Sequence, residues 1–129
     1  MDLFVIAGWV QIGALAVVAL FQLALVLGAP MGEYAFGGQH SGKLPTRFRI
    51  GSLVSIGLYL GIAGHAAAQL GLVQKLLPDA LNTAANWAIV GLMLVSLIMN
   101  GISRSKKERD LWVPVALLLF ASSFIVALG

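Results

Sequence analysis

Four apolar runs, separated by short polar stretches, constrain this chain more than any other feature. They cover residues 3–28, 46–72, 79–102 and 112–128. At 1.5 Å rise per residue, about 20 apolar residues make a helix that crosses a hydrocarbon core of about 30 Å. Only 10% of the 129 residues are charged, whereas a soluble domain carries about a quarter. We therefore expect an all-α membrane protein, with residues 1–129 forming one antiparallel bundle of four transmembrane helices.

Proline, glycine and aspartate mark the expected helix boundaries. Pro30, after a glycine, stops the first helix because proline lacks a backbone donor and clashes with the preceding turn. Pro45 bounds the second helix, and Asp79 is placed to help cap the third. Pro114 would fall in the tolerated first turn of the fourth helix. That helix is the shortest, so we expect it to span the membrane only if Leu111 and Trp112 are drawn in or the bilayer thins locally.

Basic residues predict the orientation in the membrane. The first and third loops and their edges hold Lys43, Arg47, Arg49, Arg104, Lys106, Lys107 and Arg109. The second loop has only Lys75, and the N-terminus has no basic residue. Because cytoplasmic loops are enriched in lysine and arginine, we expect both termini outside, on the periplasmic or extracellular side. The net charge of +3 comes from these loops and does not indicate a nucleic-acid partner.

Small residues form a row along the second helix, at Gly57, Gly61, Gly64 and Ala68. At 100° per residue they share one face, where another backbone can approach closely. The pattern favours packing against another helix of the same chain. The alternative is a homo-oligomer whose copies meet through this face, with membrane lipids as the other expected partners.

Gln11 and Gln22 lie three turns apart on the first helix and so face the same way. An amide facing lipid would have no hydrogen-bond partner, so we expect both to point into the bundle. Interhelical hydrogen bonds are the favoured interpretation. The alternative is a polar pathway through the membrane, which Asn100 would join.

His65 is the ionisable residue inside a span, with Gln69 one turn further on. Such a residue suggests a proton relay or a metal or haem ligand, but a hydrogen bond to a neighbouring helix is the favoured interpretation. The other histidine, His40, lies in the first loop, and Arg49 and His65 are about 24 Å apart along the second helix. One protomer therefore cannot bring both histidines to one metal, and we expect neither a metal nor a cofactor.

The first loop and its edge hold the richest polar cluster, formed by Glu33, Tyr34, His40, Lys43, Arg47 and Arg49. A carboxylate, an imidazole and several cations can bind an anionic headgroup or perform acid–base catalysis. Orientation and phospholipid contact already explain the basic members. The third loop, 103–110, mixes both signs and is expected to be a solvated turn that fixes topology.

The chain also resembles a family of small four-helix bacterial integral membrane proteins. The resemblance rests on Gly28-Ala29-Pro30, Gly32-Glu33, Gly37-Gly38 and Leu44-Pro45 of the first loop, and on Asn100, Ser103-Arg104-Ser105, Glu108-Arg109 and Pro114-Val115-Ala116. It covers nearly the whole chain. It implies the four-helix architecture and a bacterial inner (cytoplasmic) membrane, and it implies no activity.

The sequence favours a non-enzymatic accessory, scaffold or assembly protein. The first alternative is a small oligomeric transporter or channel, and the second is a lipid-directed enzyme at the inner membrane face that uses Glu33 and His40. The chain has no cysteine, which excludes enzymes that need cysteine pairs. The first helix has no acidic residue, unlike that of the small multidrug exporters.

Overall fold

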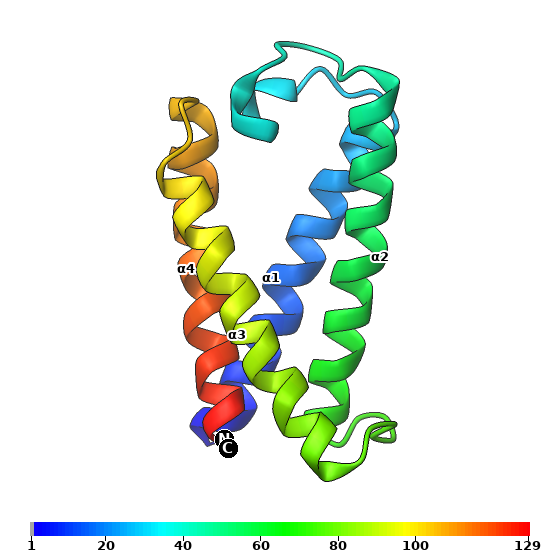
Figure 1. Ribbon diagram of the computed structural model, residues 1–129, viewed down its shortest axis with the longest axis vertical. Coiled ribbons are helices and arrows are strands. Elements are labelled where there is room, and N and C mark those ends of the chain that lie inside the picture. Colours follow the sequence, from blue (N-terminus) through cyan, green and yellow to red (C-terminus); the bar gives the residue numbers. More distant parts are fainter. Residues whose placement is uncertain (1) are drawn as a thin grey trace.

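The computed structural model describes residues 2–129 as four helices joined by short connections (Figure 1). They are α1 (Leu3–Val26), α2 (Thr46–Gln69), α3 (Asp79–Gly101) and α4 (Lys106–Leu128). Two single turns of 3₁₀-helix, η1 (Gly32–Tyr34) and η2 (Phe36–Gly38), lie in the first loop. All four long helices are long and apolar enough to cross a membrane. The predicted all-α, four-helix architecture is confirmed.

The helices divide the molecule into two pairs. α1 packs along α2, α3 packs along α4, and α1 also packs against α4. The first and third loops lie at one end, called here the capped end (Figure 1). The second loop and both termini lie at the other, called here the terminal end (Figure 1). α2 and α3 approach each other towards the terminal end and are well separated near the capped end (Figure 1).

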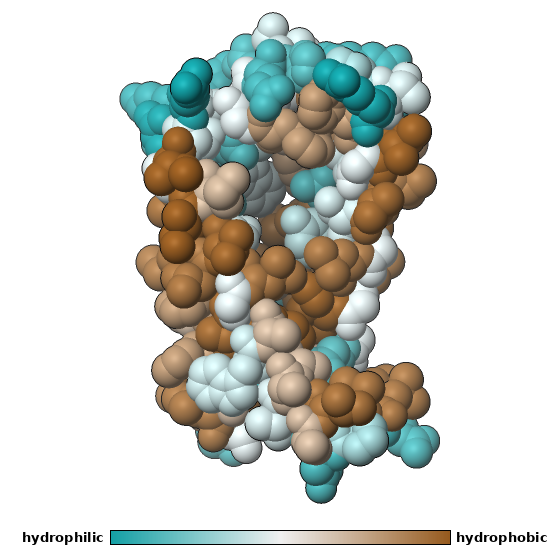
Figure 2. All heavy atoms as spheres, viewed as in Figure 1, coloured by the Kyte–Doolittle hydropathy of each residue, from teal (hydrophilic) through white to brown (hydrophobic). Residues whose placement is uncertain are grey.

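A small buried core joins the four helices. It contains Leu15, Ile62, Met93 and Leu119, one from each helix, together with Trp112. Most of the remaining apolar side chains point outwards and form a hydrophobic band, with polar residues at the two ends (Figure 2). A lipid environment suits such a surface, because lipid chains are as apolar as leucine. For the same reason, burying apolar side chains between helices gains little in lipid, and the helices associate chiefly through close packing.

The structure corrects the start of the fourth helix, which begins at Lys106 and not near Trp112. Ser105 is its N-cap, and the Ser105 hydroxyl accepts a hydrogen bond from the Glu108 backbone N–H. The helix has 23 residues, so it is about 34 Å long, but its first five residues are all charged and its apolar part, 111–128, is about 27 Å long. Pro114 consequently lies inside the helix and not in its first turn.

α1 and α2 end slightly earlier than predicted because each closes with a glycine in the left-handed region. Gly28 has φ 94° and Gly71 has φ 78°. In each case the N–H of the glycine and of the next residue bonds back to carbonyls of the last helical turn, which is the Schellman arrangement. At the start of α3, the prediction for Asp79 is wrong. No side chain caps this helix, and Asp79 lies in its first turn, where its charge favours the helix dipole.

The small-residue face of α2 is not filled from within the chain. Gly57, Gly61 and Gly64 are exposed, and a Cβ added at any of them would meet no atom within 4 Å. Only Ala68 of that row is buried. The favoured interpretation, packing against another helix of the same chain, is therefore wrong for the three glycines. A homo-oligomer through this face stays a prediction.

Substituting alanine at two glycines tests this description. Gly61→Ala should change the free energy of unfolding by less than about 1 kcal/mol, since the site is open and alanine favours helix. Gly32→Ala should destabilise the protein by about 1–3 kcal/mol, because its Cβ would meet the carbonyl oxygens of His40 and Gly42. Unfolding by sodium dodecyl sulfate in mixed micelles measures both. An equal loss in the two variants would show that the Gly61 face is packed.

Candidate functional site

The first loop folds over the capped end of the bundle as a compact cap. The Gly32 N–H donates to the Gly42 carbonyl over 2.8 Å, which closes the loop on itself. Beneath it, Ala35 and Leu44 are buried against Leu25 of α1. The loop includes two short helical turns and its own small apolar core. The cap is therefore an ordered part of the fold.

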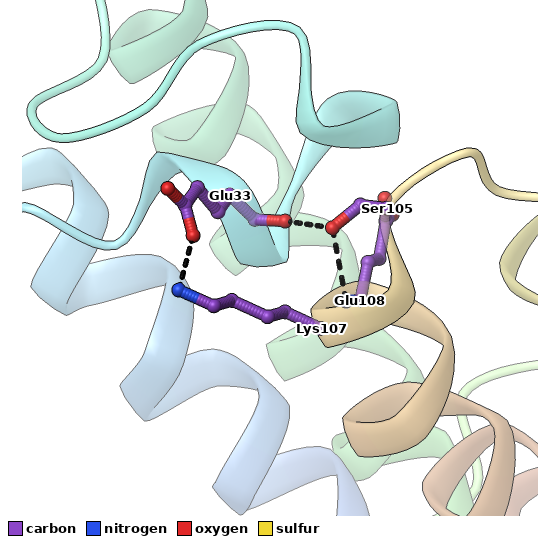
Figure 3. Close-up of polar contacts among 4 residues, drawn as sticks. All are labelled: Glu33, Ser105, Lys107 and Glu108. Carbon is purple, nitrogen blue, oxygen red and sulfur yellow. Dashed lines mark hydrogen bonds and ion pairs between the residues drawn. The ribbon is translucent and has the colours of Figure 1, made fainter.

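Three contacts join the cap to the start of α4. The Trp112 indole N–H donates to the Tyr34 carbonyl over 2.8 Å, and the Ser105 hydroxyl donates to the Glu33 carbonyl. The Glu33 carboxylate forms an ion pair with Lys107 (Figure 3). The Ser105 oxygen thus makes two hydrogen bonds: it donates to the Glu33 carbonyl of the cap and accepts from the Glu108 backbone N–H at the start of α4 (Figure 3). These bonds hold the cap across the separated helix pairs.

Other basic residues make contacts where the cap meets α1 and α2. The Arg49 guanidinium donates two hydrogen bonds, of 2.7 and 3.0 Å, to the Val26 carbonyl. That carbonyl belongs to the last turn of α1, where the helix itself supplies no donor. His40 and Arg47 both lie against the Phe48 ring, at 4.8 and 4.9 Å from its centre. These side chains therefore stabilise the junction between the cap and the helices.

The six predicted first-loop residues are thus divided among separate contacts. Glu33 and Tyr34 contact α4, whereas His40 and Arg47 contact Phe48. The enzyme interpretation required the carboxylate of Glu33 and the imidazole of His40 to act together. The structure places them in separate contacts, Glu33 with Lys107 and His40 with Phe48. Within residues 2–129, no three histidine, cysteine, aspartate or glutamate side chains are grouped to hold a metal ion.

A polar cluster joins α2 to α3 at the terminal end. The His65 ring nitrogen Nε2 lies 2.8 Å from Asn86 Oδ1. Gln69 and Asn82 exchange two hydrogen bonds of 2.8 Å, and Asn86 also donates to Gln69 over 3.3 Å. The favoured interpretation of His65, a hydrogen bond to a neighbouring helix, is confirmed. The sequence analysis missed Asn82 and Asn86. The signal was their four-residue spacing, which matches that of His65 and Gln69 and places both side chains on one helix face.

A cavity of about 130 Å³ lies between the four helices, below the cap. Val18 and Gln22 of α1, Tyr59 of α2, Ser96 and Asn100 of α3, and Trp112, Ala116 and Leu119 of α4 are among its walls. An apolar cavity of about 150 Å³ holds a benzene molecule. The space is therefore large enough for a ring or for several methylene groups of an acyl chain.

The cavity reaches the surface between α2 and α3. Leu58 and Leu92, which also line it, are 50% and 40% exposed. Figure 2 shows the corresponding hollow below the polar cap, flanked by apolar side chains. We call this the lateral opening. Its position on the hydrophobic band means that a molecule entering it would come from the surrounding apolar phase.

Polarity changes along the cavity. Gln22 and Asn100 lie near the ends of α1 and α3 at the capped end, and the Gln22 oxygen Oε1 is buried with no hydrogen-bond partner. Deeper in the bundle, Val18 and Leu119 make the walls apolar. One end of the cavity therefore suits a polar group and the other a hydrocarbon chain.

The predicted intramembrane polar residues are only partly brought together. Gln22 and Asn100 share the cavity, Gln11 is buried elsewhere, and His65 and Gln69 belong to the polar cluster between α2 and α3. Gln11 and Gln22 point inwards as expected, but their oxygens make no interhelical hydrogen bonds.

No protein-family model, no curated protein and no solved structure matches this chain.

A double-mutant cycle tests the polar cluster. Gln69→Leu and Asn82→Leu should show a coupling free energy of about 0.6–1.7 kcal/mol, the range of hydrogen bonds between membrane helices. Gln11→Leu combined with Asn82→Leu is the control and should be additive, because Gln11 Oε1 has no partner. Unfolding in mixed micelles gives all the values. Additivity of the Gln69 and Asn82 changes would contradict the structure.

Proposed function

We propose that this chain is a non-enzymatic membrane protein that binds a lipid, one acyl chain of which enters the cavity through the lateral opening. The supporting observation is a cavity with a polar shallow end and an apolar deep end that opens between two apolar helices. This is a form of the accessory role that the sequence favours. The chain would bind or sense the lipid without changing it chemically.

The proposal includes an orientation. The helices form an antiparallel bundle in a bacterial inner membrane, with the capped end in the cytoplasm and both termini outside. Seven of the eight basic residues belong to the first and third loops or their edges, and only Lys75 belongs to the second, which is the bias expected of cytoplasmic loops. The residues that flank the lateral opening, Leu58 and Leu92, lie near the middle of α2 and α3, so the opening is near the middle of the bilayer and the cavity extends from it towards the cytoplasmic side.

Depth in the bilayer matches the polarity of the cavity. In this orientation, Gln22 and Asn100 lie close to the cytoplasmic interface, at the level of lipid ester groups. The Gln22 amide nitrogen is a donor that suits an ester carbonyl. The deeper walls, with Val18 and Leu119, suit methylene groups. An ordinary membrane lipid therefore needs no reorientation to place a chain there.

Filling the cavity with a chain is physically favourable. Wall atoms beside an empty space lose dispersion contacts. A single dispersion contact is weak, but the sum over all the wall atoms is large. Lipid is the molecule nearest to the opening, so it is the natural source of those contacts.

The alternative functions have less support. A polar pathway would need Gln11, Gln22, His65 and Asn100 along one route, but Gln11 and His65 do not line the cavity. A lipid-directed enzyme would need Glu33 and His40 together, but each has a separate contact.

Fluorescence of Trp112 tests the proposal. Trp112 is 8% exposed, whereas Trp9 and Trp87 are 49% and 42% exposed, so a Trp9→Phe, Trp87→Phe variant isolates the buried indole. Brominated acyl chains quench tryptophan on contact. We expect quenching of Trp112 in bilayers of brominated phospholipid, because the chain in the cavity reaches the indole.

Two further substitutions in that background complete the test. Ser96→Phe fills the cavity and should protect Trp112 from quenching. Val95→Phe adds the same ring at the neighbouring, outward-facing position and should leave the quenching unchanged. Absence of quenching in the parent variant would contradict the proposal.

A further inference from the structure

A second hollow, of about 580 Å³, lies on the surface between the first and third loops. Gly38 and Gln39 line it on one side, and Arg104 and Lys106 on the other. The two loops approach closely here, since a Cβ on Gly38 would lie 2.6 Å from Cβ of Ser105. The Ser105 hydroxyl bonds to the Glu33 carbonyl beside it. The walls of this loop hollow are therefore held together by the Ser105 side chain, which packs against Gly38 and bonds to the Glu33 backbone carbonyl.

The loop hollow carries unneutralised positive charge. Lys107 on its wall is paired with Glu33. Arg104 and Lys106 are exposed, and across residues 2–129 neither forms an ion pair or a side-chain hydrogen bond. Glu108, the nearest following acidic residue, accepts a hydrogen bond from Ser103 and does not line the hollow. The charge that remains is that of two cations, which suits an anion.

An apolar step connects this charge to the cavity. A third hollow shares Gly37, Gln39 and Arg104 with the loop hollow. Its other walls are the apolar Phe36, Met99 and Ile102 and the polar Ser103 and Glu108, whose side chains are hydrogen-bonded to each other. The three apolar side chains are exposed, although they are large. Asn100, which follows Met99, lines the cavity. Towards the capped end of α3, the cavity wall at Asn100, the exposed apolar side chains of Met99 and Ile102, and the basic loop hollow at Arg104 therefore lie close together along the chain.

We propose that the lipid bound by this protein is an anionic phospholipid whose headgroup phosphate lies between Arg104 and Lys106. This inference rests on the proposed function, because the chain of the same lipid occupies the cavity. The headgroup lies in the loop hollow, the glycerol region passes Met99 and Ile102, and one chain enters the lateral opening. A zwitterionic phospholipid fits less well, because its own cation would lie beside Arg104 and Lys106.

The loop hollow differs from the general attraction of basic loops to membranes. Any lysine or arginine near the surface attracts anionic lipid. Lys43 and Arg47 supply the same formal charge at the capped end but do not line the hollow. Arg47 lies over the Phe48 ring, and the Lys43 side chain lies beside Gly28. These two residues provide a matched control.

The experiment uses the full chain with Trp9→Phe and Trp87→Phe in nanodiscs of phosphatidylcholine containing increasing fractions of brominated phosphatidylglycerol. The fraction that half-quenches Trp112 measures binding. Arg104→Gln with Lys106→Gln should raise that fraction roughly thirtyfold, as expected for the loss of two near-surface charges. Lys43→Gln with Arg47→Gln should raise it less than about threefold. Arg104→Lys, which keeps the charge, should stay within about threefold of the parent and so reports on folding.

The outcomes separate this inference from the proposed function. Equal weakening by the two double substitutions would show general surface attraction and would overturn the inference. Equal quenching by brominated phosphatidylcholine and brominated phosphatidylglycerol would also overturn it, while leaving chain binding in place. If neither lipid quenches Trp112, the proposed function itself fails.

Discussion

Hydrocarbon supplies no hydrogen-bond partners, and the closure of α2 on α3 depends on that constraint. His65, Gln69, Asn82 and Asn86 satisfy one another between these helices at the terminal end. No comparable group joins α2 to α3 near the capped end in the part of the chain that the structure describes, and there the helices are separated (Figure 1). Because the polar cluster closes only the terminal end, the lateral opening lies on the capped side of it.

The cap determines how a molecule can reach the cavity. The Trp112 indole and the Ser105 hydroxyl donate hydrogen bonds to backbone carbonyls of the cap, and Ala35 and Leu44 of the cap pack against Leu25 of α1. The cap therefore spans both helix pairs and covers the space between them from the aqueous side. Entry is left to the side, between α2 and α3, where the surface is apolar (Figure 2). A cavity that is covered by the cap and open only at the side favours a ligand that is already dissolved in the membrane.

The sequence predicts the helices well because long apolar runs have few alternatives, and proline and glycine mark most of their ends. The error at α4 came from treating charged residues as a loop, although Ser105 and Glu108 have the spacing of a capping box. The candidate site was harder to predict. Glu33 and His40 are close in sequence but contact different parts of the fold. The cavity depends on the angle between helix pairs, which arises from distant contacts that no local pattern records.

Photolabelling with a phospholipid that carries a diazirine in its acyl chain, followed by peptide mapping, tests most directly whether an acyl chain occupies the cavity. We predict labels on buried wall residues, above all Met93, Trp112 and Leu119, which bulk lipid cannot reach. Labels confined to outward-facing residues such as Leu60 and Val95 would contradict the account.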